Sequence, residues 1–377
     1  METHYQTAKH LDFSLFYFGN ADVYEDENEK YKLLIDGAKY GDQHGFTAVW
    51  TPERHFSEFA GLYPSPAVLG ATLAAHTKHI GIRAGSVVIP LHHPLRVAED
   101  WSVVDNLSGG RAGIACASGW QANDFVLAAD NYANRYEVMY KNIASIQQLW
   151  KGDAIPVANG NGEIKATRIF PKPLQPKLPM WITTNGNPAS FRYAGKEGYN
   201  ILTNFWGSSP DELGANIALY REAYQANGHP EGQGKIVLML HAYIAASREA
   251  AYEKAREPLI RYLRSSVGLL KHNAASGGSA TTAAALTPEE EDKMLEYSFY
   301  RYASGSSLVG SHADALEVLH KVSQLGVDEI ACLLDFGIDY TAIMESLDHL
   351  TAVKNAYQDK VTASVSSSID FDIPAGF

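Results

Sequence analysis

Short apolar runs alternate along the chain with longer segments in which apolar residues recur at helical spacing. Uniformly apolar runs of four to eight residues are typical of strands covered on both faces, and their alternation with helices is typical of βαβ units around a parallel sheet. Eight such runs are expected to form strands: LDFSLFYF (11–18), FTAVWT (46–51), IGIRAGSVVI (80–89), AGIACAS (112–118), PMWITT (179–184), NILTNF (200–205), KIVLMLHAYIA (235–245) and DEIACLLDFG (328–337).

Eight strand–helix alternations in one chain favour an α/β fold of the closed (β/α)8 TIM-barrel type. An open, doubly wound sheet is the structural alternative, because the pattern does not show whether the last strand pairs with the first. The intervening helices carry ordinary boundary signals. The segment after the third run opens with Pro94 and closes on Gly109 and Gly110, which is the expected order of proline and glycine at helix ends.

The barrel is expected to be a single domain over residues 11–360, after an N-terminal extension of residues 1–10. Two segments interrupt the alternation. Residues 152–179 are rich in proline and glycine and are expected to form a surface hairpin and loop, whereas residues 271–288 are expected to be a low-complexity, mobile insertion. The C-terminal tail, residues 361–377, resembles a linker more than a core element.

Composition narrows the class of partner. The formal net charge is -12 at pH 7 and lysine and arginine form no run, so a nucleic-acid partner is not expected. The two cysteines, Cys116 and Cys332, lie in apolar runs, which argues against a disulfide framework and fits a reducing cytoplasm. No apolar stretch approaches the ~20 residues of a membrane span, and no signal peptide is found. We therefore expect a cytoplasmic protein with no membrane partner.

The second strand ends in Glu53, Arg54 and His55, where a TIM barrel places its chemistry. One interpretation is structural: Glu53 pairs with Arg54 or a nearby cation, and His55 packs in the interior. The other is that these residues supply a general base or a hydrogen-bond donor at the barrel mouth, and their position favours it. The adjacent His92 and His93 show no metal-ligand spacing, so no metal is expected.

Two later strand ends also carry candidate chemistry. Ala117 and Ser118 are small, so they either pack against a helix or let a flat ring lie close to the sheet. Gly186, Asn187 and Ser190 suit a tight turn and a capped helix start, which is either an ordinary helix cap or a phosphate site at a helix N-terminus. No GxGxxG or GxxxxGK[ST] motif occurs in a strand–turn–helix context, so a Rossmann or P-loop nucleotide site is not expected.

From Leu11 to about Leu350 the chain resembles the bacterial luciferase-like flavin monooxygenases, in particular the branch associated with natural-product assembly lines. The resemblance is densest in GFTAVWTPERHF, YPSPAVLGATLAAHT, IRAGSVVIPLHHPLRVAEDWSVVDNLSGGR and ASGWQANDF. It implies a barrel that binds reduced FMN at its C-terminal mouth, with O2 as co-substrate, and oxidises a substrate through a flavin C4a-(hydro)peroxide.

The resemblance also implies roles for individual residues. The cofactor-binding positions that it implies are Gly85 and Ser86 at a non-prolyl cis peptide under the flavin ring, Ala117 and Ser118 along the isoalloxazine, and Gly186, Asn187 and Ser190 in the phosphate loop.

One catalytic position departs from the family pattern. Luciferases proper carry Glu-His-His at the second strand end and use the first histidine as a base, whereas this chain has Arg54 there. Arginine stays protonated near neutral pH and is a poor base, but it can stabilise a developing negative charge or hold a substrate carbonyl or phosphate. His55 is therefore the expected acid/base, with Glu53 orienting it or Arg54.

The resulting prediction is a flavin-dependent monooxygenase acting on a secondary-metabolite intermediate, free or bound to a carrier protein as a thioester, by hydroxylation or Baeyer–Villiger insertion. A flavin reductase is expected to supply the reduced FMN, and the resemblance implies a homodimer. Two alternatives remain. One is an F420-dependent dehydrogenase on the same scaffold, disfavoured because NGNPAS (residues 185–190) contains no basic residue; the other is a non-catalytic flavin-binding protein, to which Arg54 gives some weight.

Overall fold

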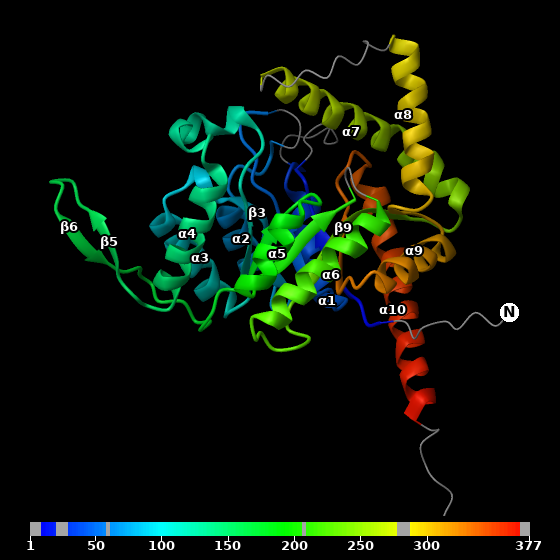
Figure 1. Ribbon diagram of the computed structural model, residues 1–377. Coiled ribbons are helices and arrows are strands. Elements are labelled where there is room, and N and C mark those ends of the chain that lie inside the picture. The colour runs from blue at the N-terminus through cyan, green and yellow to red at the C-terminus, as the bar shows by residue number, and fades with distance from the viewer. Residues whose placement is uncertain (1–8, 20–28, 58–60, 206–208, 277–286, 370–377) are drawn as a thin grey trace, which may run out of the picture.

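The computed structural model describes residues 9–19, 29–57, 61–205, 209–276 and 287–369. All eight predicted strands are present and parallel to their neighbours (Figure 1). They are β1 (Asp12–Phe16), β2 (Ala48–Thr51), β3 (Gly81–Val88), β4 (Ala112–Ala117), β7 (Met180–Thr183), β8 (Asn200–Asn204), β9 (Ile236–Ile244) and β11 (Glu329–Leu333).

The sheet closes into a barrel. β1 pairs in parallel with β2 and with β11, in the registers Leu15↔Val49 and Phe13↔Ile330. β9 in turn pairs with β8 and β11, so neither end of the strand series is left as an edge. The (β/α)8 barrel is therefore confirmed, and the open sheet is wrong.

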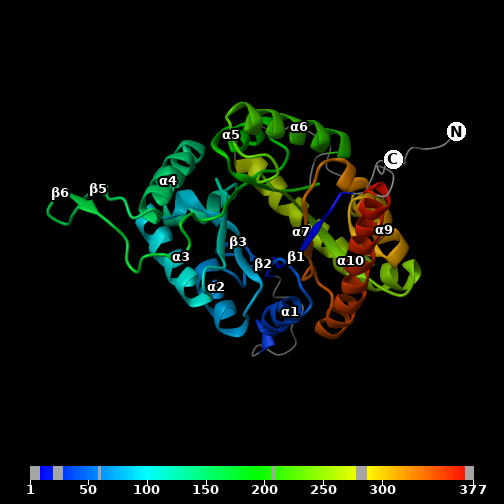
Figure 2. The ribbon, with the colours of Figure 1, turned by 90° about the horizontal axis from the view of Figure 1, so that it is seen from below.

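Helices surround the strands, as the view along the barrel shows (Figure 2). They are α1 (Lys32–Gln43), α2 (Pro66–His76), α3 (Pro94–Ser108), α4 (Arg135–Trp150), α5 (Pro188–Glu197), α6 (Pro210–Ala226), α7 (Arg248–Ser276), α8 (Pro288–Ala303), α9 (His312–Gln324) and α10 (Tyr340–Ile369), with short 3-10 helices at Ile89–Leu91, Ala122–Leu127 and Ala129–Asn131. The expected boundaries of α3 are confirmed, since Pro94 is its first residue and Gly109 ends it at φ 70°.

Three helices, α7, α8 and α9, lie between the barrel strands β9 and β11, where a simple (β/α)8 barrel has one. α7 and α8 precede β10 (Leu308–Gly310), a short strand that pairs with β9. In Figure 1 both helices lie at the top of the molecule. Tyr262 of α7 and Tyr302 of α8 reach the cavity described below, so this insertion supplies part of the site.

The predicted insertions and tail differ in outcome. The expected hairpin is formed by β5 (Ile155–Ala158) and β6 (Ile164–Thr167), which project from the barrel (Figure 1). Both ends of the predicted 271–288 insertion are helical, because α7 runs to Ser276 and α8 starts at Pro288; residues 277–286 lie outside the described part of the chain.

The tail was expected to begin at residue 361 as a linker, and this is wrong for its first part. α10 continues to Ile369, and Val361 is still buried. Val361 follows Tyr357 and Val353 at helical spacing, and all three pack into the core, so the amphipathic face of α10 extends past the predicted boundary. Residues 370–377 and 1–8 lie outside the described residues.

A polar network fills the barrel interior on the amino-terminal side of Gly85. The Arg83 guanidinium donates to both Glu329 carboxylate oxygens at 2.9 Å and lies over the rings of Trp50 and Trp181, at 4.9 and 4.6 Å. Ser14 also donates to Glu329, at 2.5 Å. Because the Glu329 carboxylate and the Arg83 guanidinium pair with each other, neither charge is left unpaired inside the barrel.

The two cysteines bear out the expectation that no disulfide forms. Cys116 in β4 and Cys332 in β11 are both buried and free. In the part of the chain that the structure describes, no helix combines the length and apolar character needed to cross a membrane.

Candidate active site

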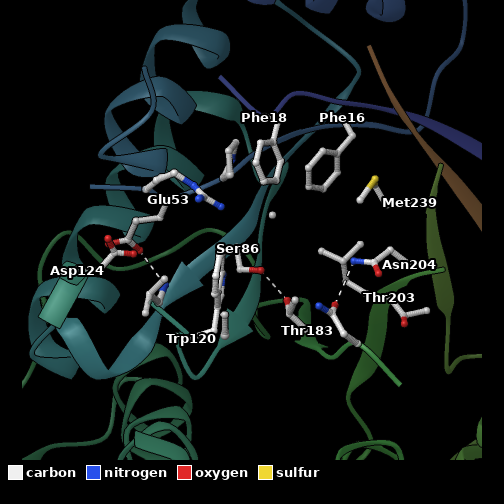
Figure 3. A pocket seen from close by; sticks show the side chains of 18 of the residues that line it. Phe16, Phe18, Glu53, Ser86, Trp120, Asp124, Thr183, Thr203, Asn204 and Met239 are labelled. Atoms are coloured by element: carbon white, nitrogen blue, oxygen red, sulfur yellow. Dashed lines mark hydrogen bonds between the residues drawn. The ribbon is translucent and has the colours of Figure 1, made fainter. Parts of the chain in front are cut away.

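A cavity of about 330 Å³ lies at the carboxyl ends of the barrel strands (Figure 3). Its lining residues lie on or just after β1, β2, β3, β4, β7, β8 and β9, with one tyrosine each from α7 and α8. This is the end at which a TIM barrel builds its active site. Figure 3 shows Glu53 and Asp124 on one side of the cavity and Thr203 and Asn204 on the opposite side.

β3 supplies the central wall. The Gly85–Ser86 peptide bond is cis, which confirms the expectation drawn from the resemblance, and the pairing of β3 with β4 shifts register between Ala84 and Val87. Gly85 and Ser86 both line the cavity, and the Ser86 hydroxyl is hydrogen-bonded to the Thr183 hydroxyl at 2.6 Å. A Cβ atom at Gly85 would lie 2.7 Å from Cε2 of Phe16, so any larger residue here would require Phe16 to shift.

The end of β4 provides a second wall. Ala117 lines the cavity as expected, and Gly119 and Trp120 follow it, whereas Ser118 is not among the lining residues. Gly119 has φ 76°, and a Cβ atom there would lie 2.8 Å from Val88 and Phe125. Ala117 therefore borders the cavity beside Gly85–Ser86, Gly119 packs closely against Val88 and Phe125, and the flat-ring interpretation stays a prediction.

β7 and β8 contribute a polar wall that the sequence analysis did not single out. Thr183, Asn185, Thr203 and Asn204 line the cavity, and the Asn204 amide donates to the Asn185 side-chain oxygen at 3.0 Å. The signal for this wall was the polar residues at the ends of the runs PMWITT and NILTNF. Their amides and hydroxyls offer both donors and acceptors to the edge of a heterocycle.

The predicted phosphate loop begins next to this wall. Asn187 caps α5 by accepting from the Ala189 N–H at 3.0 Å, and Gly186 turns the chain at φ 82°. Asn187 is exposed, whereas Ser190 is buried. Gly186, Asn187 and Ser190 are not among the cavity-lining residues, although Asn185 is. Their role in holding a phosphate stays a prediction.

Glu53 is the centre of a buried hydrogen-bond cluster. Its Oε1 atom is bonded to His55 Nε2 at 2.9 Å and to His92 Nε2 at 2.5 Å, and its Oε2 accepts from the Val88 N–H at 2.7 Å. Its side chain is 0% exposed. The structural interpretation is therefore right that Glu53 is paired, but the partners are the two histidines and not Arg54.

The histidines determine the charge state of Glu53. Burial by itself would raise the pKa of Glu53, but the hydrogen bonds from His55 and His92 outweigh it and lower that pKa. Burial would likewise lower the pKa of His92, but its bond to Glu53 raises that pKa above the ordinary value. Glu53 is thus anionic at neutral pH with its acceptor positions occupied, and it is not a free base.

His92 and His93 serve different purposes. His92 bonds to Glu53, and His93 caps α3 by accepting from the Leu95 N–H at 3.3 Å. Among the residues that the structure describes, no group of three or more histidine, cysteine, aspartate or glutamate side chains is arranged to hold a metal ion.

Arg54 lines the cavity, and no described residue accepts a hydrogen bond from its side chain. The residue is 8% exposed, and its guanidinium lies 5.0 Å from the ring centroid of Phe18 and 5.5 Å from that of Trp120. Its Nη1 atom is buried with no hydrogen-bond partner among the described residues, and burial lowers the pKa of the side chain. Arg54 lines the cavity, whereas His55 does not.

Further lining residues were missed by the sequence analysis. His241 on β9 is bonded through Nδ1 to the Tyr302 hydroxyl at 2.8 Å, and burial lowers its pKa to about 3, so it is neutral. Tyr262 and Tyr302 reach the cavity from α7 and α8. A lone histidine near the end of an apolar run was the available signal for His241, whereas nothing local marks the two tyrosines.

The family model for luciferase-like monooxygenases matches residues 11–329. The oxygenase component of a flavin-dependent trigonelline monooxygenase from Acinetobacter baylyi is 25% identical over 352 residues, which cover 90% of this chain and 93% of that protein. The similarity thus runs through the whole barrel.

Solved structures share the fold. Monooxygenase RslO1 from Streptomyces bottropensis superposes with a TM-score of 0.73 at 18% identity, over 91% of this chain and 98% of that one. A second structure is the oxygenating constituent of 3,6-diketocamphane monooxygenase from Pseudomonas putida, a type II Baeyer–Villiger monooxygenase in complex with FMN. It superposes with a TM-score of 0.70 at 17% identity, over 91% of this chain and 97% of that one. At these identities the likeness establishes the fold alone.

Proposed function

Since the chain belongs to the luciferase-like monooxygenase family, we propose that it is a flavin-dependent monooxygenase whose cavity holds reduced FMN beside a small organic substrate. The observation that carries the proposal is the open, glycine-lined wall at Gly85–Ser86, which faces a polar wall from β7 and β8 in one cavity. The names of the trigonelline oxygenase component and of the FMN-bound camphane enzyme support the choice of cofactor.

The residues present suit a flavin. A flat ring would lie against Gly85, Ser86 and Ala117, with its polar edge toward Thr183 and Asn204, and its phosphate at the exposed N-terminus of α5. When bound, reduced FMN supplies the electrons that activate O2. The apolar side chains of Phe16, Phe18 and Met239 keep water from the space that remains, as seen at the top and right of Figure 3.

Arg54 and His55, the two ionisable residues expected to take part in the reaction, lie differently relative to the cavity. Arg54 faces the cavity and is placed to stabilise negative charge on bound groups. His55 is bonded to Glu53 and does not line the cavity, so the acid/base role predicted for it requires proton transfer through Glu53 or a movement of the side chain.

We propose a flavin reductase as the source of reduced FMN, because the trigonelline enzyme is named as an oxygenase component. The substrate is a secondary-metabolite intermediate, free or carrier-bound, and the reaction is hydroxylation or Baeyer–Villiger insertion.

A homodimer through α2 and α3 is supported by the exposed apolar side chains of Val68, Val103 and Leu107. A monomer mass in sedimentation equilibrium at micromolar concentration would exclude the dimer.

The test of function is reconstitution. With NADH, a flavin reductase and FMN under oxygen, the protein is expected to bind reduced FMN and to change the rate of flavin reoxidation at least tenfold, measured by stopped-flow absorbance. An unchanged reoxidation rate at saturating protein would refute the monooxygenase. Selective binding of reduced F420 would favour the dehydrogenase alternative, and FMN binding without any change of reoxidation would favour the flavin-binding protein.

Asn187→Asp is expected to weaken FMN binding at least tenfold. Aspartate caps a helix as well as asparagine does, so the α5 start is retained while a negative charge is placed where the phosphate is predicted. Equilibrium dialysis of FMN and of riboflavin, which lacks the phosphate, measures the effect. We expect riboflavin affinity to change less than twofold.

The matched control is Asn159→Asp on the exposed β5–β6 hairpin, where the Asn159 side-chain oxygen accepts from two backbone N–H groups. Aspartate can keep both bonds, and FMN affinity should stay as in the unmodified protein. Equal FMN affinities in Asn187→Asp and the control would place the phosphate away from α5.

A further inference from the structure

Arg54 is a buried cation that forms no ion pair with any side chain in the described part of the chain. Its side chain makes no hydrogen bond and no ion pair with any residue that the structure describes, and its contacts are the faces of Phe18 and Trp120. A guanidinium carries five N–H donors, and burying them without acceptors is unfavourable. A ligand in the cavity can provide the missing acceptors.

The nearby carboxylates do not fill this role. Glu53 precedes Arg54 in the chain, but its oxygens are bonded to His55, His92 and the Val88 N–H. Asp124 lines the same cavity and interacts with Arg54 only through space, and its Oδ1 atom is also buried without a partner. The Arg54 guanidinium is therefore available to an anionic ligand in the cavity, and Asp124 is its acidic neighbour.

The surroundings of Arg54 indicate the kind of anion. The aromatic rings of Phe18 and Trp120 lie against the guanidinium, and Tyr262 lines the same cavity. The hydroxyls and amides lie across the cavity at Thr203 and Asn204 (Figure 3), where the polar edge of a flavin is proposed to bind. A planar guanidinium pairs with a carboxylate through two parallel N–H bonds, which a neutral carbonyl cannot match.

We propose that the substrate carries a carboxylate, that Arg54 binds it, and that an apolar body packs against Phe18 and Trp120. As a statement about the substrate, this inference rests on the proposed function. The binding itself does not require a flavin. A second source of negative charge is the bound cofactor, because Arg54 can also face an anionic form of the flavin, and the experiment separates the two.

The probe pair is benzoate and benzamide, which share size and ring but differ in charge. Isothermal titration of the flavin-free, full-length protein is expected to show benzoate binding at least tenfold more tightly than benzamide. Arg54→Gln should abolish this preference, so that both probes bind with affinities within about twofold of each other. Arg168→Gln, on the exposed segment after the hairpin, should behave as the unmodified protein does.

Asp124→Asn is expected to change the affinity for benzoate in the direction opposite to Arg54→Gln. Removing the acidic neighbour while keeping the shape should strengthen benzoate binding about two- to tenfold and leave benzamide unchanged. Thermal unfolding gives a second readout. Benzoate should raise the Tm of the unmodified protein and not that of Arg54→Gln. Without ligand the Tm of Arg54→Gln should not fall, because the arginine that is removed forms no hydrogen bond and no ion pair with a described residue.

Three results would overturn the proposal: equal affinities for the two probes in the unmodified protein, a preference for benzoate that survives in Arg54→Gln, or no detectable benzoate binding. If Arg54 binds the flavin and not the substrate, Arg54→Gln should weaken the binding of reduced FMN at least tenfold. The unmodified protein should then show no preference for benzoate over benzamide. Failure of the proposed function gives a different result. A protein that does not change the reoxidation rate of reduced FMN can still bind benzoate more tightly than benzamide.

Discussion

Glu53→Gln is expected to lower the free energy of unfolding by about 3–5 kcal/mol, which is typical when one partner of a buried ion pair is removed. The neutral amide presents N–H donors where the carboxylate accepted from His55, His92 and the Val88 N–H, so at least one buried donor loses its partner. Urea unfolding followed by circular dichroism measures the change.

Glu163→Gln on the hairpin is the matched control. Glu163 is 59% exposed and pairs with Lys165, so its replacement should change stability by less than about 1 kcal/mol. Similar losses in the two variants would mean that the Glu53 cluster contributes nothing specific to stability.

The difference between the unmodified protein and Glu53→Gln should depend on pH. The folded-state pKa of Glu53 is lowered from 4.5, so its contribution is present above that value and is lost as the pH falls through the folded pKa. The folded-state pKa of His92 is raised from 6.5, so its contribution is present below that value and is lost as the pH rises through the folded pKa. The difference should therefore be largest between about pH 4.5 and 6.5. A constant difference from pH 4 to 9 would contradict the ionic pair.

Gly85→Ala is expected to reduce reduced-FMN affinity at least tenfold and stability by about 1–3 kcal/mol. The added Cβ would lie 2.7 Å from Cε2 of Phe16 and 3.2 Å from Cβ of Trp50. Trp50 is fully buried, so Phe16, which lines the cavity, has to move into the space proposed for the ring. Anaerobic titration with reduced FMN and urea unfolding measure the two effects.

Gly214→Ala in α6 is the control, because a Cβ atom there meets only Leu325 at the ordinary distance of 3.5 Å. Removing a helical glycine should raise stability by about 0.4–1 kcal/mol and leave FMN affinity unchanged. If Gly85→Ala binds reduced FMN as Gly214→Ala does, the ring does not lie against Gly85.

The strands and their order could be read from the chain because burial on both faces leaves a local mark. A run such as FTAVWT has no polar face, so it becomes a buried strand wherever it lies. Helix starts and ends were equally local, as at Pro94 and Gly109. The end of α10 was missed because Tyr357 and Val361 become core residues only when the barrel packs against them.

The site was predicted in part for the same reason. Strand ends are local, so Glu53, Arg54 and Ala117 were found from them, whereas Gly85 and Ser86 came from the family resemblance; all five line the cavity. The partner of Glu53 was not found, because His92 lies 39 residues away and meets Glu53 only when β2 and β3 are side by side. Ser118 and the loop from Gly186 to Ser190 were placed by motif, and the cavity itself does not reach them.

By itself the sequence determined the eight strands of the barrel, their alternation with helices and the strand ends that carry polar groups, since each depends on residues close together in the chain. Tertiary structure alone decided that the sheet closes, that Glu53 binds two histidines, that Nη1 of Arg54 finds no acceptor among the described residues, and that Tyr262 and Tyr302 line the cavity. Each of these depends on distances between segments far apart in sequence, which hydrophobic spacing does not encode.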